Sequence, residues 1–269
     1  MAWFINLNPI IQSALAGLFT WLCTLVGASM VFLVKEVNQK VLATMQGAAA
    51  GIMVAASFWS LLSPALEQAS SFSLPAWLPV SIGFLAGGIF LRLMDKFVPH
   101  LHLSGDHGDT DPSETSLSKT WMLFLAVTIH NIPEGMAMGV AFAAAASGVE
   151  GAGLASALSL AIGIGIQNIP EGSALSLPLM ADGKGKWRSF NMGQLSAIVE
   201  PFSAMLGAAA VIAMQSILPY ALSFAAGAMI FVVVEELIPE SQTPGNTDLA
   251  TMSFMVGFVI MMVLDVALG

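Results

Sequence analysis

Long apolar segments follow one another along almost the whole chain, and this feature restricts the fold more than any other. An apolar stretch of about 20 residues is long enough for a helix to cross a bilayer. We expect eight such spans, at residues 10–34, 41–66, 77–95, 119–147, 152–181, 190–214, 218–239 and 248–268. Of the 269 residues, 57% are apolar and only 9% are charged, as in polytopic membrane proteins. The sequence therefore predicts an all-α membrane protein with a single transmembrane domain over residues 1–269.

Basic residues are confined to one side of this arrangement. They flank the connections after the first, third and fifth spans, at Lys35, Lys40, Arg92, Lys96, Lys119, Lys184, Lys186 and Arg188. Because cytoplasmic connections carry an excess of Lys and Arg, this side is predicted to be cytoplasmic. With an even number of spans, both termini are then extracytoplasmic.

The connection at 96–118 is the one sizeable polar segment of the sequence. Its side chains include His100, His102, Asp106 and His107. Imidazole and carboxylate groups suit divalent transition metals, so this cytoplasmic loop is a candidate for metal sensing. A His-containing tract is only a compositional signal, and a solvated loop without a metal role explains it equally well.

The second and seventh spans resemble each other in sequence. The second contains Ala49-Ala50-Gly51-Ile52-Met53, and the seventh contains Ala225-Ala226-Gly227-Ala228-Met229. The two spans run in opposite directions in the predicted topology. This indicates an inverted repeat of spans 1–3 and 6–8 around spans 4–5, an arrangement typical of transporters. Because Ala and Gly are common in membrane helices, chance similarity is the alternative explanation.

A polar motif occurs twice, on the fourth and fifth spans. The fourth contains His130-Asn131-Ile132-Pro133-Glu134-Gly135, and the fifth contains Gln167-Asn168-Ile169-Pro170-Glu171-Gly172. Residues three or four positions apart share a helix face, so the first two polar side chains of each copy flank its glutamate. The prolines free backbone carbonyls, which need a partner such as water or an ion at membrane depth. The repetition therefore predicts one shared polar site.

A third carboxylate is predicted at the same depth. Counting from the cytoplasmic span ends places His130, Gln167 and Glu200 within about 6 Å of one level, at roughly 1.5 Å per residue. Glu134, Glu171 and Glu200 would then meet near mid-membrane, where the sequence provides no Lys or Arg. Neighbouring carboxylates cannot all stay ionised unless protons or metal cations neutralise them. Two divalent cations would suffice, with neutral His, Asn and Gln side chains completing the ligand sets.

We interpret this constellation as a site for exchangeable divalent metal ions. It is rich in oxygen and holds a single histidine, unlike the closed Cys and His sets of structural zinc sites. Alternatively, the amide side chains only join helices by hydrogen bonds and the prolines only kink them. The presence of two motif copies together with Glu200 favours the metal site.

Candidates for the ion pathway lie on the second and seventh spans, at Ser57, Ser60, Glu67, Glu235, Glu236 and Glu240. Those on the second span continue at helical spacing from Met53, which is either a soft thioether ligand or a packing residue. The three glutamates of the seventh span either receive cations that leave the site or form a solvated helix end.

The paired motif, the eight predicted spans and the His-containing loop resemble the ZIP family of divalent metal transporters, specifically its bacterial GufA-like branch. The resemblance covers essentially the whole chain, and the paired motif is its most specific part. It implies a binuclear metal centre with ligands His130, Asn131, Glu134, Gln167, Glu171 and Glu200, and it suggests Met53 as a further ligand. Asn168, at the second position of the second motif, is included as a candidate ligand.

The chain departs from the family pattern in the second motif. Many members have His-Glu at the start of this motif, and others have an acid at its second position, whereas this chain has Gln167-Asn168. The substitution lowers the charge of the site and puts full occupation of the second metal position in doubt.

The resemblance also implies a function. It implies uptake of zinc into the cytoplasm across the bacterial inner membrane, with cadmium, iron and manganese as alternative substrates, and an elevator-like movement of spans 1, 4, 5 and 6. We expect divalent metal ions and the lipid bilayer as partners, with no organic cofactor and no nucleic acid, and a homodimer is left open.

Two other functions compete with metal transport. An intramembrane metallohydrolase needs a firmly held metal, an open water position and a general base. The sequence has no His-Glu-x-x-His motif, and His130 is the only histidine in a predicted span, so we expect a protein that is not an enzyme. A proton or cation channel with a carboxylate relay is the other alternative.

Overall fold

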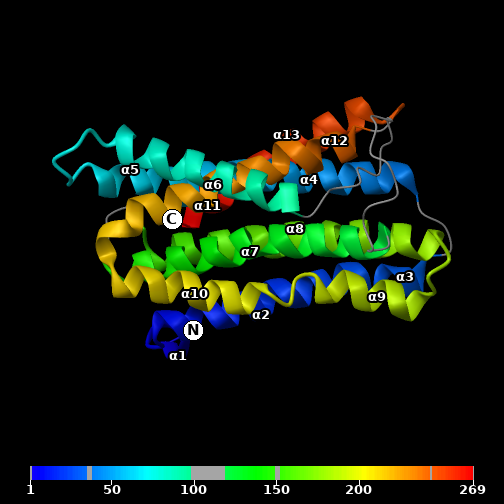
Figure 1. The fold of residues 1–269 in the computed structure, drawn as a ribbon, viewed down its shortest axis with the longest axis horizontal. Helices are drawn as coiled ribbons and strands as arrows, with labels where there is room; N and C mark the ends of the chain where they lie inside the picture. The colour runs from blue at the N-terminus through cyan, green and yellow to red at the C-terminus, as the bar shows by residue number, and fades with distance from the viewer. Residues whose placement is uncertain (1, 35–37, 98–118, 149–151, 243, 269) are drawn as a thin grey trace.

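The computed structural model describes residues 2–34, 38–97, 119–148, 152–242 and 244–268, and the regular structure in these ranges is entirely helical (Figure 1). The helices are α1 (Ala2–Ile5), α2 (Pro9–Ala28), α3 (Met30–Leu33), α4 (Gln39–Ala56), η1 (Ser57–Leu62), α5 (Ser63–Ala69), α6 (Trp77–Phe97), α7 (Lys119–Ala146), α8 (Leu154–Ala181), α9 (Lys186–Leu195), α10 (Glu200–Ala213), η2 (Gln215–Ile217), α11 (Leu218–Val232), η3 (Val233–Leu237), α12 (Ile238–Ser241) and α13 (Thr247–Leu268). The predicted all-α class is confirmed for these residues. The loop candidates His100, His102, Asp106 and His107 lie outside them.

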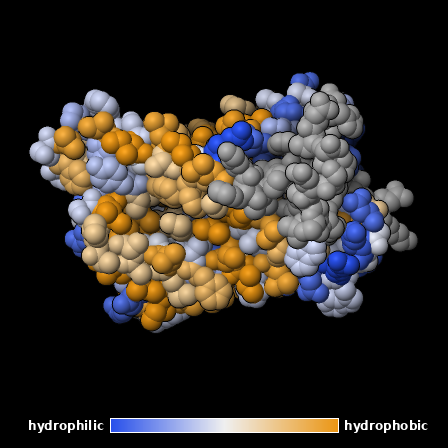
Figure 2. Space-filling model, in the orientation of Figure 1, coloured by the Kyte–Doolittle hydropathy of each residue, from blue (hydrophilic) through white to orange (hydrophobic). Residues whose placement is uncertain are grey.

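Six helical stretches among the described residues are long and apolar enough to cross a membrane. They are Pro9–Leu33, Gln39–Ala69, Trp77–Met94, Lys186–Ala213, Gln215–Ser241 and Thr247–Ala267. α7 and α8 are not among the six, although each has 28 residues, and both contain the polar motif. On the face shown in Figure 2, apolar side chains cover the middle of the molecule and hydrophilic ones gather towards its ends. This distribution is that of a multi-pass membrane protein.

The helices form two bundles that lie side by side (Figure 1). In the first bundle α2 packs on α8 and α7 packs on α10, while in the second α4 packs on α13 and α6 packs on α11. Contacts of α8 with α4 and α13, and of α7 with α11, join the two bundles. α7 and α8, which carry the paired motif, therefore lie where the bundles meet.

Each of the four helix pairs within the bundles has a close crossing built from two glycines, one on each helix. A Cβ atom on any of these glycines would overlap a backbone atom of the partner helix. The pairs are Gly27 with Gly172, Gly139 with Gly207, Gly51 with Gly257, and Gly87 with Gly227. Small residues allow membrane helices to approach closely and gain van der Waals contact. These crossings hold each bundle together internally.

Two π-helical segments, η1 and η3, interrupt helices of the second bundle, and each lies shortly before a proline. In η1 the backbone N–H of Ser63 bonds to the carbonyl of Phe58, and in η3 the N–H of Ile238 bonds to the carbonyl of Val233. A proline cannot donate a hydrogen bond, and its ring clashes with the carbonyl four residues earlier. The π-helical turn before Pro64 and Pro239 accommodates this conflict. η3 thereby changes the direction in which the glutamates of the seventh span point.

The sixth predicted span, expected as one helix over 190–214, is interrupted at residues 196–199 between α9 and α10. Pro201 is the physical reason, because it removes a backbone donor and clashes with the carbonyl of Ala197. As a result Glu200 lies in the first turn of α10, where the helix dipole favours a negative charge.

Candidate functional site

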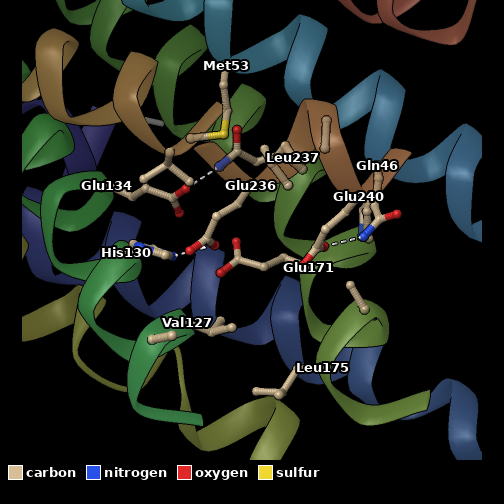
Figure 3. A pocket seen from close by; sticks show the side chains of 16 residues that line it. Gln46, Met53, Val127, His130, Glu134, Glu171, Leu175, Glu236, Leu237 and Glu240 are labelled. Atoms are coloured by element: carbon tan, nitrogen blue, oxygen red, sulfur yellow. Dashed lines mark hydrogen bonds and ion pairs between the residues drawn. The ribbon is translucent and has the colours of Figure 1, made fainter. Parts of the chain in front are cut away.

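A cavity of about 70 Å³ lies where the two bundles meet, between α4, α7, α8 and the stretch from α11 to α12 (Figure 3). Its lining starts near the middle of each continuous helical stretch, at Met53, Glu134, Gln167 and Val232. On all four it continues towards the end of the molecule where α4 and α7 begin and where α8 and α12 end. That end carries the basic residues from which a cytoplasmic side was predicted. The cavity therefore extends from mid-molecule towards the predicted cytoplasm.

The polar lining of this cavity is acidic. Its polar side chains are Gln46, His130, Glu134, Gln167, Glu171, Glu236 and Glu240. Four of these are glutamates, and no Lys or Arg occurs among the described residues of the lining. Because carboxylates gathered at this depth are costly without positive charge nearby, the cavity favours cations.

His130 and Glu236 face each other inside the cavity. The Nδ1 atom of His130 lies 2.9 Å from a carboxylate oxygen of Glu236, and the His130 side chain is almost fully buried. His130 belongs to α7 in one bundle and Glu236 to η3 in the other, so this contact crosses the interface between the bundles. Sequence reasoning had placed Glu236 in the exit pathway and did not foresee this contact.

Gln167 and Glu134 join the two copies of the motif directly. The Gln167 side-chain amide donates a hydrogen bond of 2.6 Å to a Glu134 carboxylate oxygen. Met53 lines the same end of the cavity and is 1% exposed, and Figure 3 shows its sulfur on the side where Glu134 lies. The predicted candidates His130, Glu134, Gln167 and Met53 are thus brought together around one space.

The remaining two glutamates of the lining lie nearer the predicted cytoplasmic end. Glu171 interacts electrostatically with His130, Asn131 and Glu236. Glu240 accepts a hydrogen bond of 2.7 Å from the side-chain amide of Gln46 on α4. The cavity therefore continues from the motif to Glu240 as a row of carboxylates, which are the groups expected along a cation route.

Asn168 and Glu200 form a second cluster, which lies outside the lining of the cavity. The Asn168 amide donates to a Glu200 oxygen at 2.7 Å and to the backbone carbonyl of Thr20 at 3.2 Å. The hydroxyl of Thr20 donates to the other Glu200 oxygen. All three side chains are fully buried. The structure thus separates Glu200 from the open cavity and ties it to α2.

Oxygen atoms of the paired motif are left without hydrogen-bond partners. Among the described residues, six buried side-chain polar atoms lack a partner, and four of them are motif oxygens: Oδ1 of Asn131, Oε2 of Glu134, Oε1 of Gln167 and Oδ1 of Asn168. Buried polar groups are nearly always satisfied, so such groups need an explanation such as an ion. Acceptor oxygens from both motif copies are the groups that a cation would satisfy.

No three His, Cys, Asp or Glu side chains in the described ranges lie close enough to hold one metal ion as they stand. The reason is that amide side chains make up part of the site and contact its carboxylates. Gln167 binds Glu134 and Asn168 binds Glu200, so neutral donors occupy oxygen atoms that a cation would otherwise contact.

The other candidates of the second and seventh spans lie apart from the cavity. The hydroxyl of Ser57 bonds to the backbone carbonyl of Met53, and Glu67 is exposed on α5. Ser60 bonds to Asp265 of α13. Glu235 lines a different groove, between α6 and α11, together with Arg92.

Sequence reasoning missed two residues that contact the site, Thr20 and Gln46. Thr20 belongs to a row of small and polar residues at helical spacing on α2, namely Ser13, Gly17, Thr20, Thr24 and Gly27, all of which are buried. A search for this spacing would have indicated a polar face on the first span. Nothing in the local sequence around Gln46 distinguishes it.

Comparisons with known proteins agree with this architecture. Residues 102–265 match the family model described as ZIP zinc transporter. The chain is 39% identical to zinc transporter ZIP11 of Homo sapiens, with 97% of the chain and 98% of the relative covered. It is 38% identical to zinc transporter GufA of Myxococcus xanthus, with 97% and 98% covered. It is 35% identical to zinc transporter ZIPB of Bordetella bronchiseptica, with 96% of the chain and 81% of the relative covered. The family model covers more than half of the chain and the relatives cover nearly all of it, so the protein belongs to the ZIP zinc transporter family.

Proposed function

We propose that this protein carries divalent metal cations across the membrane, with zinc as its main substrate and the paired motif as its transport site. The observation that carries the proposal is the set of four partnerless motif oxygens beside an acidic cavity. The relatives named above, all called zinc transporters, support zinc as the ion. Cadmium, iron and manganese are accepted by similar ligand sets, so we expect them to compete with zinc.

The first metal position is the one at the cavity. His130, Glu134, Gln167 and Glu171 would supply nitrogen and oxygen ligands, and Met53 a thioether sulfur. An ion here replaces the hydrogen bond between Gln167 and Glu134, because the Glu134 carboxylate binds a cation more strongly than a neutral amide. Neutral amide and imidazole ligands limit the charge of the site, which favours exchange over permanent binding.

The second metal position lies behind the first, towards α2 and α10. Its ligands would be Asn131, Asn168 and Glu200, with Glu134 and Glu171 shared between the two positions. The partnerless Oδ1 atoms of Asn131 and Asn168 support a cation there. The hydrogen bonds from Thr20 and Asn168 to Glu200 must be released before Glu200 binds the ion. We therefore expect the second ion to bind more weakly than the first.

Ions leave along the glutamates that lead away from the motif, Glu236 and Glu240. The cavity extends from the motif in this direction only, towards the end where Lys40, Lys184 and Lys186 lie. If that end is cytoplasmic, as the distribution of basic residues predicts, the conformation described here releases metal inwards and the protein works as an importer in the bacterial inner membrane. Both termini are then extracytoplasmic.

We further propose eight spans, with α7 and α8 as the fourth and fifth. Both are 28 residues long and lie among the spanning helices, although the polar motif reduces their apolar character. A helix buried in a bundle tolerates such residues where they face a site.

An inverted repeat of spans 1–3 and 6–8 is supported by corresponding features. Gly51 and Gly227 both form glycine crossings, and each is followed after the same interval by a π-helical segment. The third and eighth spans also match, since residues 87–95 and 257–265 both begin with Gly and end with Asp. With this pairing the transport site would lie between the repeat halves, an arrangement typical of transporters.

We propose that transport involves an elevator-like movement of the α2, α7, α8 and α9–α10 bundle along the other bundle. Glycine crossings fix the helices within each bundle, whereas the interface between the bundles contains a cavity. Rigid bundles that meet at such an interface are suited to sliding as units.

The test is zinc and cadmium flux into proteoliposomes of purified protein. We expect flux in the wild type and at least a tenfold loss, about 1.4 kcal/mol of transition-state stabilisation, in His130→Ala and Glu171→Ala. Asp182→Asn, at an exposed position after α8, is the matched control and should transport normally. Flux that survives in both motif variants, or that is absent from the wild type, would contradict the proposal.

A further inference from the structure

Asp265 is a carboxylate inside the second bundle that the metal site does not use. It lies on α13 and is 6% exposed. The Ser60 hydroxyl donates a hydrogen bond of 2.7 Å to its Oδ1 atom, and its Oδ2 atom has no partner among the described residues. It is the one carboxylate outside the paired motif with a buried, partnerless oxygen in the described ranges.

Among the described residues around Asp265, no positive charge compensates the carboxylate. The elements that pack on α13 are α4, η1 and α8. Their charged residues are Lys40 at the start of α4 and Glu171 on α8, and neither is among the groups that act on Asp265. Burial of a carboxylate with one hydrogen bond and no cation beside it favours the protonated, neutral form.

A metal ion fits Asp265 poorly. The site offers one carboxylate and one hydroxyl, whereas hard divalent cations require six or more oxygen ligands and zinc requires four ligands. A proton needs a single carboxylate oxygen. The ligand that this pair can hold by itself is therefore a proton.

The α13 segment around Asp265 contacts α8 of the other bundle. Ser159 of α8 donates a hydrogen bond of 3.2 Å to the backbone carbonyl of Leu264, the residue directly before Asp265. Gly163, one turn further along α8, lies against the sulfur of Met261 on α13. A shift of α8 along α13 therefore changes the packing of the residues next to the carboxylate.

We propose that Asp265, held by Ser60, is a proton-binding site whose exchange with water depends on the position of α8, and that it links metal transport to proton binding. In the conformation described here the carboxyl is covered and carries its proton. When α8 shifts, water reaches the carboxyl and the proton dissociates. The inference rests on the proposed transport function but concerns residues outside the metal site.

The test compares the pH dependence of zinc uptake in wild type, Asp265→Asn and Ser60→Ala proteoliposomes. If uptake requires ionised Asp265 in part of the cycle, the wild-type rate falls by up to about tenfold per pH unit below the midpoint. Asp265→Asn keeps the volume and the acceptor for Ser60, so it should transport zinc with a flattened pH profile. Ser60→Ala should move the midpoint to higher pH, because the ionised carboxylate loses a hydrogen bond.

Two further measurements make the result independent of transport rate. The infrared spectrum of the wild type minus that of Asp265→Asn should contain the carbonyl stretch of one protonated carboxyl. Zinc titration should give the same stoichiometry for both proteins. Asp248→Asn, at the exposed start of α13, is the control and should behave as wild type throughout.

A pH profile of Asp265→Asn that superimposes on the wild-type profile would overturn the proposal, as would a difference spectrum without the carboxyl band. Loss of one zinc equivalent in Asp265→Asn would show a metal site instead. If the wild type transports no zinc at all, it is the proposed function that fails, and the infrared band still decides whether Asp265 holds a proton.

Discussion

The carboxylate of Glu236 lies 2.9 Å from Nδ1 of His130, and this contact joins the two bundles at the cavity. A metal-binding histidine almost always has its other ring nitrogen held by a carboxylate or carbonyl, which fixes the orientation of the ring. In this chain that carboxylate comes from the π-helical turn before Pro239, on a different bundle from the histidine. If His130 binds the metal and the bundles move as proposed, this one contact would link metal release to that movement.

The first prediction concerns Glu236→Gln. The variant keeps the shape of the side chain but weakens its hold on His130, and loss of such a supporting contact typically lowers metal affinity by about 10- to 100-fold. Zinc titration of purified protein measures the effect. Glu235→Gln is the control, because Glu235 lies in the groove between α6 and α11, away from the cavity. Equal affinities of the two variants would exclude a supporting role for Glu236.

The second prediction concerns Asn168→Asp. Without metal the change removes the donor to Glu200 and places two carboxylates side by side, so thermal stability should fall. With metal the added charge should strengthen the second position, because a carboxylate binds a divalent cation more tightly than a neutral amide does. Thermal unfolding with and without zinc measures both effects. If zinc raises the unfolding temperature of the variant no more than it raises that of the wild type, the result would argue against a second ion.

The third prediction decides between the two roles of Met53. Leu has nearly the same volume, and such an exchange in a core usually costs less than about 1.5 kcal/mol. If the sulfur is a ligand, Met53→Leu should lower cadmium affinity more than zinc affinity, because cadmium is the softer ion. Competition of the two ions in flux assays gives the ratio. Met138→Leu, at a fully buried site outside the cavity lining, is the control. An unchanged ratio would leave Met53 as a packing residue.

The fourth prediction tests the glycine crossings. A Cβ at Gly172 would overlap the backbone carbonyl of Thr24, so Gly172→Ala must push α2 and α8 apart. Overpacking of this kind usually costs about 1–3 kcal/mol. Gly88→Ala is the matched control, since the nearest atom to its Cβ would be 4.0 Å away. Thermal unfolding in detergent should show a lower midpoint for Gly172→Ala only. Equal midpoints would mean that the crossing tolerates a wider spacing.

Local sequence predicted the helices and the residues of the paired motif. The apolar segments are long and nearly continuous, so helical structure follows from the need to satisfy backbone groups within each segment. The positions of His130, Glu134, Gln167 and Glu171 around one cavity agree with helical spacing and residue counting. Glu200 lies beside the second motif copy, as its predicted depth requires, but in a separate cluster from the cavity. Residue counting gives the depth of a side chain along a helix and does not give the direction in which the side chain points.

Only the tertiary structure decided which side chains meet between helices that are distant in the sequence. His130 contacts Glu236, Glu200 contacts Thr20, and Ser60 contacts Asp265, and the partners in each pair are more than 100 residues apart. These pairings depend on the rotation of each helix, which is set by the glycine crossings and the π-helical turns rather than by hydrophobic periodicity. The sequence by itself determined the membrane helices, the family and the chemistry of the site, whereas helix packing determined how that chemistry is divided between an open cavity, a closed cluster and a separate buried acid.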